Sequence, residues 1–104
     1  MIDRERLDAA MALYDIPEYM RDGIRVYVFN HQEPGSFLRA VLENSFIDAF
    51  AYADNNNLER MHSYAQLLYS KFPSRSLGIL WGSSEIVAAW IKMGVTSNPQ
   101  KVEH

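Results

Sequence analysis

Apolar residues recur every three or four positions along most of this chain, a spacing that places them on one face of an α-helix. The first such segment covers residues 3–14, and its apolar face is formed by Leu7, Ala10, Met11 and Tyr14. Alternation with a period of two, which would indicate a half-buried strand, is confined to the short run 26–29. The pattern therefore predicts an all-α fold.

Residues that interrupt helices divide this pattern into five or six short helices. Pro34 and Gly35 mark the clearest break, because proline disfavours helix in the residue before it and glycine permits unusual backbone angles. Asn44 and Ser45 mark a second break, and Pro73 ends the longest helix. The predicted helices cover residues 3–14, 17–31, 36–43, 46–53, 58–72 and 83–94. We expect them to form one compact bundle.

Polar residues and glycine at the ends of these segments predict how each helix begins and ends. Serine, asparagine and aspartate side chains can accept a hydrogen bond from the first backbone N–H groups of a helix. The residues predicted to cap helices in this way are Asp15, Ser36, Ser45, Asn56 and Ser83. Gly94 is predicted to stop the last helix. Residues 1–95 are then a single helical domain, and residues 96–104 are a polar, mobile C-terminal tail.

Each predicted helix has an apolar face that we expect to lie in the core. In the helices after the first, these faces comprise Met20, Ile24, Tyr27, Val28 and His31; Phe37, Leu38, Val41 and Leu42; Phe46, Ala49, Phe50 and Ala53; Leu58, Met61, Ala65, Leu68 and Phe72; and Val87, Trp90 and Ile91. Gly23 lies inside the second helix at a cost of roughly 1 kcal/mol relative to alanine, which we interpret as a point of close packing. Residues 74–81 are expected to form a loop that lies against the body of the protein.

The chain is rich in large apolar side chains for its length. It has 104 residues, of which 48% are hydrophobic and thirteen are aromatic (two Trp, six Tyr and five Phe). A chain of this size buries only about 60–70% of its unfolded surface. After the core is filled, several rings remain, chiefly tyrosines on the flanks of helices, so we expect a surface for a protein partner or a homodimer. The candidate binding tyrosines are Tyr19, Tyr64 and Tyr69.

The charge balance argues against general binding of nucleic acid. Ten Lys and Arg against thirteen Asp and Glu give a formal net charge of −3, whereas such binders usually carry a basic excess. One alternative stays open, because Arg21, Arg25 and Arg39 lie on two helices that a hairpin could bring together. Three guanidinium groups on one surface would bind an anionic small ligand or nucleic acid. Ordinary surface ion pairs with Glu18 and Asp22 are the other interpretation of Arg21 and Arg25.

Several residue patterns that catalysis or metal binding would use are missing. The chain has no cysteine, which excludes disulfides, thiolate zinc sites and iron–sulfur clusters. The three histidines form no His-x-x-x-His pair, and the five glycines match no phosphate-binding loop. There is also no Gly-x-Ser-x-Gly turn to present a nucleophilic serine. We therefore expect no catalytic residue, no metal ligand and no cofactor, and a protein that is not an enzyme.

The sequence also predicts a cytoplasmic protein. Its first residues mix acids and bases and lack the apolar core of a signal peptide. The longest uncharged apolar stretch, residues 76–84, is far shorter than the ~20 residues that span a bilayer. We therefore expect no membrane partner.

One string of residues resembles a family of small helical proteins encoded by bacteriophages and prophages, whose members are mostly of unknown function. The string is Pro34-Gly35-Ser36-Phe37-Leu38-Arg39-Ala40-Val41-Leu42-Glu43-Asn44, followed by Ala53-Asp54 and then by Trp81-Gly82-Ser83. The resemblance covers residues 16–91 and implies a small protein of a phage or mobile element, located in the host cytoplasm. Accessory proteins of this kind often bind a host or defence component, including restriction or CRISPR machinery. The expected function is therefore stoichiometric protein–protein interaction, as an inhibitor of such a component, with the arginine-based binding module as the alternative.

Overall fold

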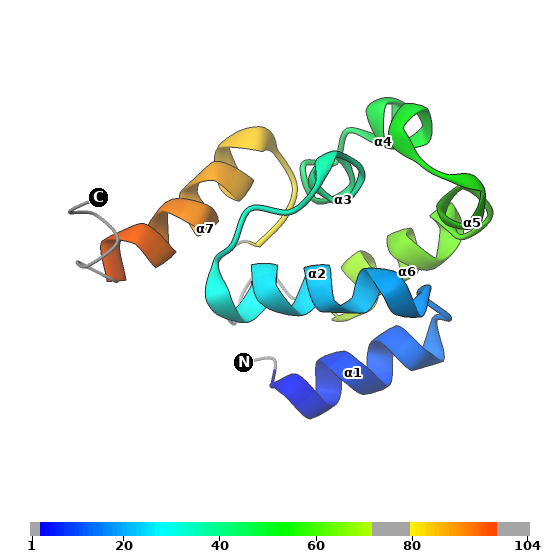
Figure 1. Ribbon diagram of the computed structural model, residues 1–104, viewed down its shortest axis with the longest axis horizontal. Coiled ribbons are helices and arrows are strands. Elements are labelled where there is room, and N and C mark those ends of the chain that lie inside the picture. Colours follow the sequence, from blue (N-terminus) through cyan, green and yellow to red (C-terminus); the bar gives the residue numbers. More distant parts are fainter. Residues whose placement is uncertain (1–2, 72–79, 98–104) are drawn as a thin grey trace.

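The computed structural model describes residues 3–71 and 80–97 of the chain. These residues form seven helices and no strand, which confirms the predicted all-α fold with one helix more than expected (Figure 1). The helices are α1 (Arg4–Leu13), α2 (Glu18–Asn30), α3 (Ser36–Leu42), α4 (Phe46–Tyr52), α5 (Asn55–Glu59), α6 (Met61–Lys71) and α7 (Ser84–Ser97). None of them is both long enough and apolar enough to cross a bilayer.

The helix α2 lies at the centre of the arrangement. It runs antiparallel to α1, while α3 and α4 lie above it in Figure 1 and α7 extends from the end at which α2 finishes. The helix α1 packs against α2 and α6, and α3 packs against α4 and α7. Side chains from α2, α3 and α6 meet in the interior, where Ile24, Leu38 and Leu67 are at most 4% exposed. The described helices thus share one core.

Two of the helices end in the same hydrogen-bonded turn, with a residue of positive φ just after the helix. After α1, Asp15 has φ 57°, and the Ile16 N–H donates to the Met11 carbonyl at 2.9 Å. After α3, Asn44 has φ 62°, and the Ser45 N–H donates to the Ala40 carbonyl at 2.9 Å. This is the Schellman arrangement, in which the residue after the left-handed one is drawn back over the helix end.

The Schellman turn explains why the prediction of Asp15 as a cap was wrong. Asp15 completes the end of α1, and the N-cap of α2 is Pro17, which has no capping side chain. Burial of Ile16, which is 0% exposed, fixes this geometry. Similarly, the N-cap of α3 is Gly35 rather than Ser36, which is the first helical residue.

Most of the predicted apolar faces lie in the core. The predicted residues that are at most 7% exposed are Leu7, Ala10, Met11, Ile24, Tyr27, Val28, Phe37, Leu38, Val41, Leu42, Ala49, Met61, Leu68, Val87 and Trp90. Two predictions were wrong, because Phe50 is 51% exposed and Leu58 is 46% exposed. The helix α4 is only seven residues long and buries Ala49 alone, so its remaining apolar side chains are not all covered.

The prediction that the polar residues 54–57 precede the next helix was also wrong. Asp54 is the actual N-cap, since its Oδ1 accepts the Asn57 N–H at 2.8 Å, and α5 starts at Asn55. The long predicted helix 58–72 is therefore replaced by α5 and α6, which separate at Arg60.

The last helix starts as predicted but continues past its predicted stop. The Ser83 Oγ accepts the Ile86 N–H at 3.2 Å, so Ser83 is a cap, and α7 then runs through Gly94 to Ser97. A Cβ on Gly94 would lie 2.5 Å from the His31 Cβ, so glycine is needed there for close packing rather than to end the helix. The predictions for residues 72–79, including Phe72 and the stop at Pro73, and for the tail from residue 98 onward lie outside the described residues.

Candidate functional site

The three candidate arginines do not form one anion-binding surface. The Arg25 Nε lies 2.7 Å from the Asp8 carboxylate of α1, and its guanidinium also lies 2.6 Å from the Asp22 carboxylate. The hydrogen bond to Asp8 is the main reason why the pKa of Arg25 is raised. With two carboxylates on one guanidinium, the net charge at this place is negative. The bond joins α1 to α2 and has a structural role.

Arg39, like Arg25, forms ion pairs with two carboxylates. Its guanidinium lies 2.9 Å from the Glu43 carboxylate and 2.6 Å from the Glu33 carboxylate, and the bond to Glu43 contributes most to its raised pKa. Arg21 instead donates through Nε to the Ile16 carbonyl at 2.9 Å. Arg25 and Arg39 each contact two carboxylates, so neither offers an uncompensated positive charge to an anion, which argues against the arginine cluster.

Among the candidate tyrosines, Tyr64 belongs to the core. It is 1% exposed, its ring packs edge-on against Phe37 at 5.1 Å between centroids, and its hydroxyl donates to Asn57 Oδ1 at 2.5 Å. Burial raises the pKa of the Tyr64 hydroxyl. The prediction that Tyr64 is a binding residue was therefore wrong, because a partner cannot reach a buried side chain. The spacing of Tyr64 from Met61 and Leu68, three and four residues, is compatible with this core position, but nothing in the spacing indicated the bond to Asn57.

Tyr19 and Tyr69 are exposed, at 56% and 88%, and lie in different surroundings. The Tyr19 hydroxyl donates to Asp54 Oδ2 at 2.5 Å, which links the start of α2 to the cap of α5. Together with Arg21 it lines a polar pocket of about 330 Å³, where Arg60 forms an ion pair with Asp15 at 3.1 Å.

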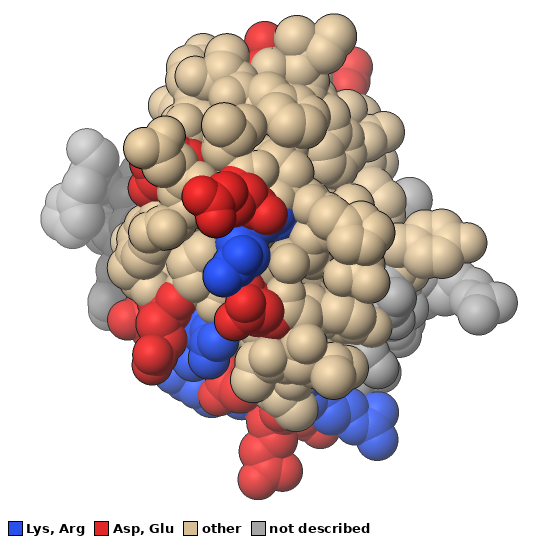
Figure 2. All heavy atoms as spheres, turned by 90° about the vertical axis from the view of Figure 1, so that its right-hand side faces the viewer, with Lys and Arg blue, Asp and Glu red and all other residues tan. Residues whose placement is uncertain are grey.

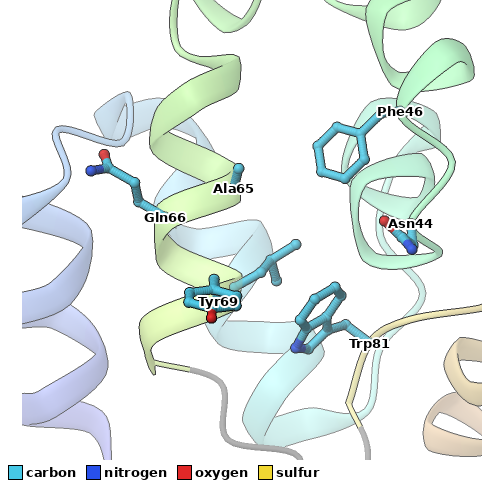
Figure 3. A pocket seen from close by; sticks show the side chains of 7 residues that line it. Asn44, Phe46, Ala65, Gln66, Tyr69 and Trp81 are labelled. Atoms are coloured by element: carbon cyan, nitrogen blue, oxygen red, sulfur yellow. The ribbon is translucent and has the colours of Figure 1, made fainter.

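Tyr69 lines a larger and mainly apolar pocket of about 520 Å³, which we call the α4–α6 groove (Figure 3). Its lining residues are Asn44, Phe46, Ala65, Gln66, Leu68, Tyr69 and Trp81. In Figure 3 the rings of Phe46 and Trp81 lie on one side of the groove and the α6 side chains lie on the other. Its walls thus come from three parts of the chain that are distant in sequence.

An exposed apolar row on α4 adjoins this groove. Ile47 is 87% exposed, Phe50 is 51% exposed, and Ala51 is also exposed; we call these three residues the α4 stripe. Phe46 and Phe50 are four residues apart, so they lie on the same side of the helix, one turn from each other. The wall of the groove therefore continues along α4 as an uncovered apolar surface. Sequence reasoning missed it because the same spacing had assigned Phe50 to the core.

The described residues contain no group of three His, Asp or Glu side chains placed to hold a metal ion. No family model matches the chain, and no curated protein or solved structure is significantly similar to it. Among the described residues, the α4–α6 groove and the α4 stripe together offer an open, mainly apolar surface to a ligand.

Proposed function

We propose that this protein acts by binding another protein stoichiometrically, through the α4–α6 groove and the α4 stripe. The observation that carries the proposal is an open apolar pocket beside Ile47 and Phe50, which are 87% and 51% exposed. Contiguous exposed apolar surface on a small protein often marks an interaction site. Aromatic side chains in and around a pocket, such as Phe46 and Trp81, are also typical of the residues that contribute most to binding energy.

The resemblance to small phage proteins suggests where to find the partner. We propose a host cytoplasmic protein, including a component of a restriction or CRISPR-type defence system, which this chain would inhibit by occupying its surface. In this proposal the protein is not an enzyme, and the complex itself produces the effect. Self-association through the same surface would produce a homodimer, which light scattering on the purified chain distinguishes from binding to a different partner.

The experiment is capture of host proteins on the tagged chain, with variants that differ only on α4. We expect the natural chain to retain a defined partner and the Ile47→Ser/Phe50→Ser variant to lose it, because the variant removes the exposed apolar surface. Tyr52→Ser is the matched control, since Tyr52 is 59% exposed on the opposite flank of the same helix. Circular dichroism would establish that all three proteins are equally helical. Equal retention by the stripe variant, or a strict monomer that captures nothing, would contradict the proposal.

A further inference from the structure

We infer that the segment of the partner that occupies this surface is an amphipathic α-helix, with a large apolar side chain in the α4–α6 groove and Lys or Arg residues beside it. This inference rests on the proposed function, because it specifies the chemistry of the partner at the same surface. Three properties of the surface support it: the lining of the groove, the length of the α4 stripe and the sign of the charge beside it.

The lining of the groove favours an apolar side chain as its occupant. A pocket of about 520 Å³ lies within the range of about 300–1,000 Å³ that is usual for ligand sites. Its walls are mainly aromatic and aliphatic, and its uncharged polar side-chain groups include the amides of Asn44 and Gln66. A charged or strongly polar group would lose its hydration here and find few hydrogen-bonding partners. An aromatic or aliphatic anchor avoids this cost.

The α4 stripe fits a partner helix better than a peptide that adds a strand to a sheet. The α4 stripe runs from Ile47 to Ala51, about 6 Å at 1.5 Å per residue, which is also the rise between positions i and i+4 of a partner helix. A helix satisfies its own backbone hydrogen bonds. A peptide that binds by adding a strand would need the edge of a sheet, and the described residues contain no strand.

The charge around the stripe favours a basic partner. From residue 40 to residue 59 the sequence contains four acidic residues and no Lys or Arg. Three of these acids, Asp48, Asp54 and Glu59, are exposed. Figure 2 shows the end of the molecule that carries α4 and α5, and among the described residues the upper part of this face has no Lys or Arg. Asp48 follows Ile47 on α4 and is exposed, so a basic residue that flanks the apolar face of a partner helix would meet this carboxylate.

The same charges disfavour a second copy of the chain as the occupant. If two stripes met face to face, Asp48 of each copy would approach the acidic surface of the other. Like charges brought together at an interface weaken it.

The inference can be tested by selecting peptides against the full chain from a displayed library of random sequences of about 16 residues, long enough for about four helical turns. We expect the enriched peptides to have apolar residues at positions i, i+3, i+4 and i+7 and an excess of Lys and Arg. In fluorescence anisotropy they should bind the chain saturably and more weakly as salt is added. The Ile47→Ser/Phe50→Ser variant should bind them at least about tenfold more weakly, and Tyr52→Ser should bind them as the natural chain does.

Other outcomes would overturn the inference. These are enriched peptides that are acidic or lack helical spacing, binding that the stripe variant leaves unchanged, and selection that yields no stripe-dependent peptide. A natural chain that sediments as a dimer, with an Ile47→Ser variant that sediments as a monomer, would identify a second copy as the occupant instead. If a captured protein depends on the stripe but crosslinks through a segment that is not a basic helix, the inference fails while the proposed function stands. A natural chain that captures no partner and selects no stripe-dependent peptide would contradict the inference and the proposed function together.

Discussion

Two glycines inside helices have very different surroundings. A Cβ added to Gly23 in α2 would lie 3.6 Å from the Leu38 Cδ2, an ordinary contact, whereas one added to Gly94 in α7 would lie 2.5 Å from the His31 Cβ. We expect Gly23→Ala to stabilise the protein by about 0.5–1 kcal/mol, because alanine favours the helix and fits the space. Gly94→Ala should instead destabilise it by about 1–3 kcal/mol, because α7 must move away from the end of α2. Urea denaturation followed by circular dichroism measures both, and the same sign for the two variants would contradict this difference.

The hydroxyl of Tyr64 satisfies a buried acceptor on a different helix. Asn57 is 3% exposed, and its Oδ1 accepts the Tyr64 hydroxyl at 2.5 Å. Tyr64→Phe keeps the ring against Phe37 but leaves that oxygen without this donor, so we expect a loss of about 1–3 kcal/mol of unfolding free energy. Tyr69→Phe is the matched control, since Tyr69 is 88% exposed, and should change the free energy by less than about 0.5 kcal/mol. Equal effects of the two substitutions would show that the buried bond contributes little.

At the scale of the element, Asp54 connects the start of α5 to the start of α2. Its carboxylate accepts the Asn57 N–H at 2.8 Å and the Tyr19 hydroxyl at 2.5 Å. The hydrogen bond from Tyr19 is the main cause of a pKa below the usual value of 3.8 for an aspartate. The unfolded chain therefore takes up a proton at a higher pH than the folded chain does, so stability falls as the pH decreases through the lowered pKa.

This shift predicts how a substitution changes the response to acid. We expect Asp54→Asn to show a smaller loss of stability than the natural chain as the pH falls from about 5 to about 2, because asparagine can still cap the helix but does not titrate. Thermal unfolding across this range measures the difference. The pKa of Glu85 is also lowered, so the variant should retain part of the acid dependence. Parallel pH profiles for the two proteins would exclude Asp54 as a contributor.

The helical elements differ in how well the sequence predicts them. Apolar spacing identified the inward faces of α1, α2 and α3 because each of these helices is covered by others, as at Leu7, Ile24 and Phe37. The same spacing failed at Phe50, since it shows which residues share a face of a helix but not whether another helix covers that face. The start of α5 was missed for a different reason. A run of Asp and Asn is typical of both turns and caps, and only the bond from the Asn57 N–H to Asp54 decides between them.

At the scale of the whole molecule, the candidate site could not be predicted because its parts are far apart in the sequence. Phe46, Tyr69 and Trp81 line one groove although 35 residues separate the first from the last. The arginine hypothesis failed for a related reason. Asp8, which precedes Arg25 by 17 residues, reaches its guanidinium only because α1 folds back along α2. An amino-acid pattern indicates local structure, whereas sites of this kind depend on how the helices pack.

The helix α7 extends from one end of the fold (Figure 1). Whether it unfolds together with the other helices therefore shows whether the molecule unfolds as one unit. Its attachment is made by polar groups as well as by apolar packing. The Trp90 Nε1–H donates to the Tyr27 carbonyl at 2.8 Å, and the Tyr27 hydroxyl donates to the Leu80 carbonyl at 2.6 Å. The His31 Nδ1 lies 2.8 Å from the Trp90 carbonyl oxygen, and Val87 is fully buried. Since α7 shares the core of α2, we expect its loss to expose that core and to unfold the remainder.

This attachment predicts a single cooperative transition. Both tryptophans, Trp81 and Trp90, lie in or next to α7, so their fluorescence reports on that part of the molecule, whereas circular dichroism reports on all of the helices. The two signals should have the same midpoint in urea, and Trp90→Phe should lower both midpoints together, because it removes the donor to the Tyr27 carbonyl. A fluorescence transition at lower urea would show instead that α7 separates first. The polar contacts with Tyr27 and His31 would then hold α7 in place without making it part of the cooperative core.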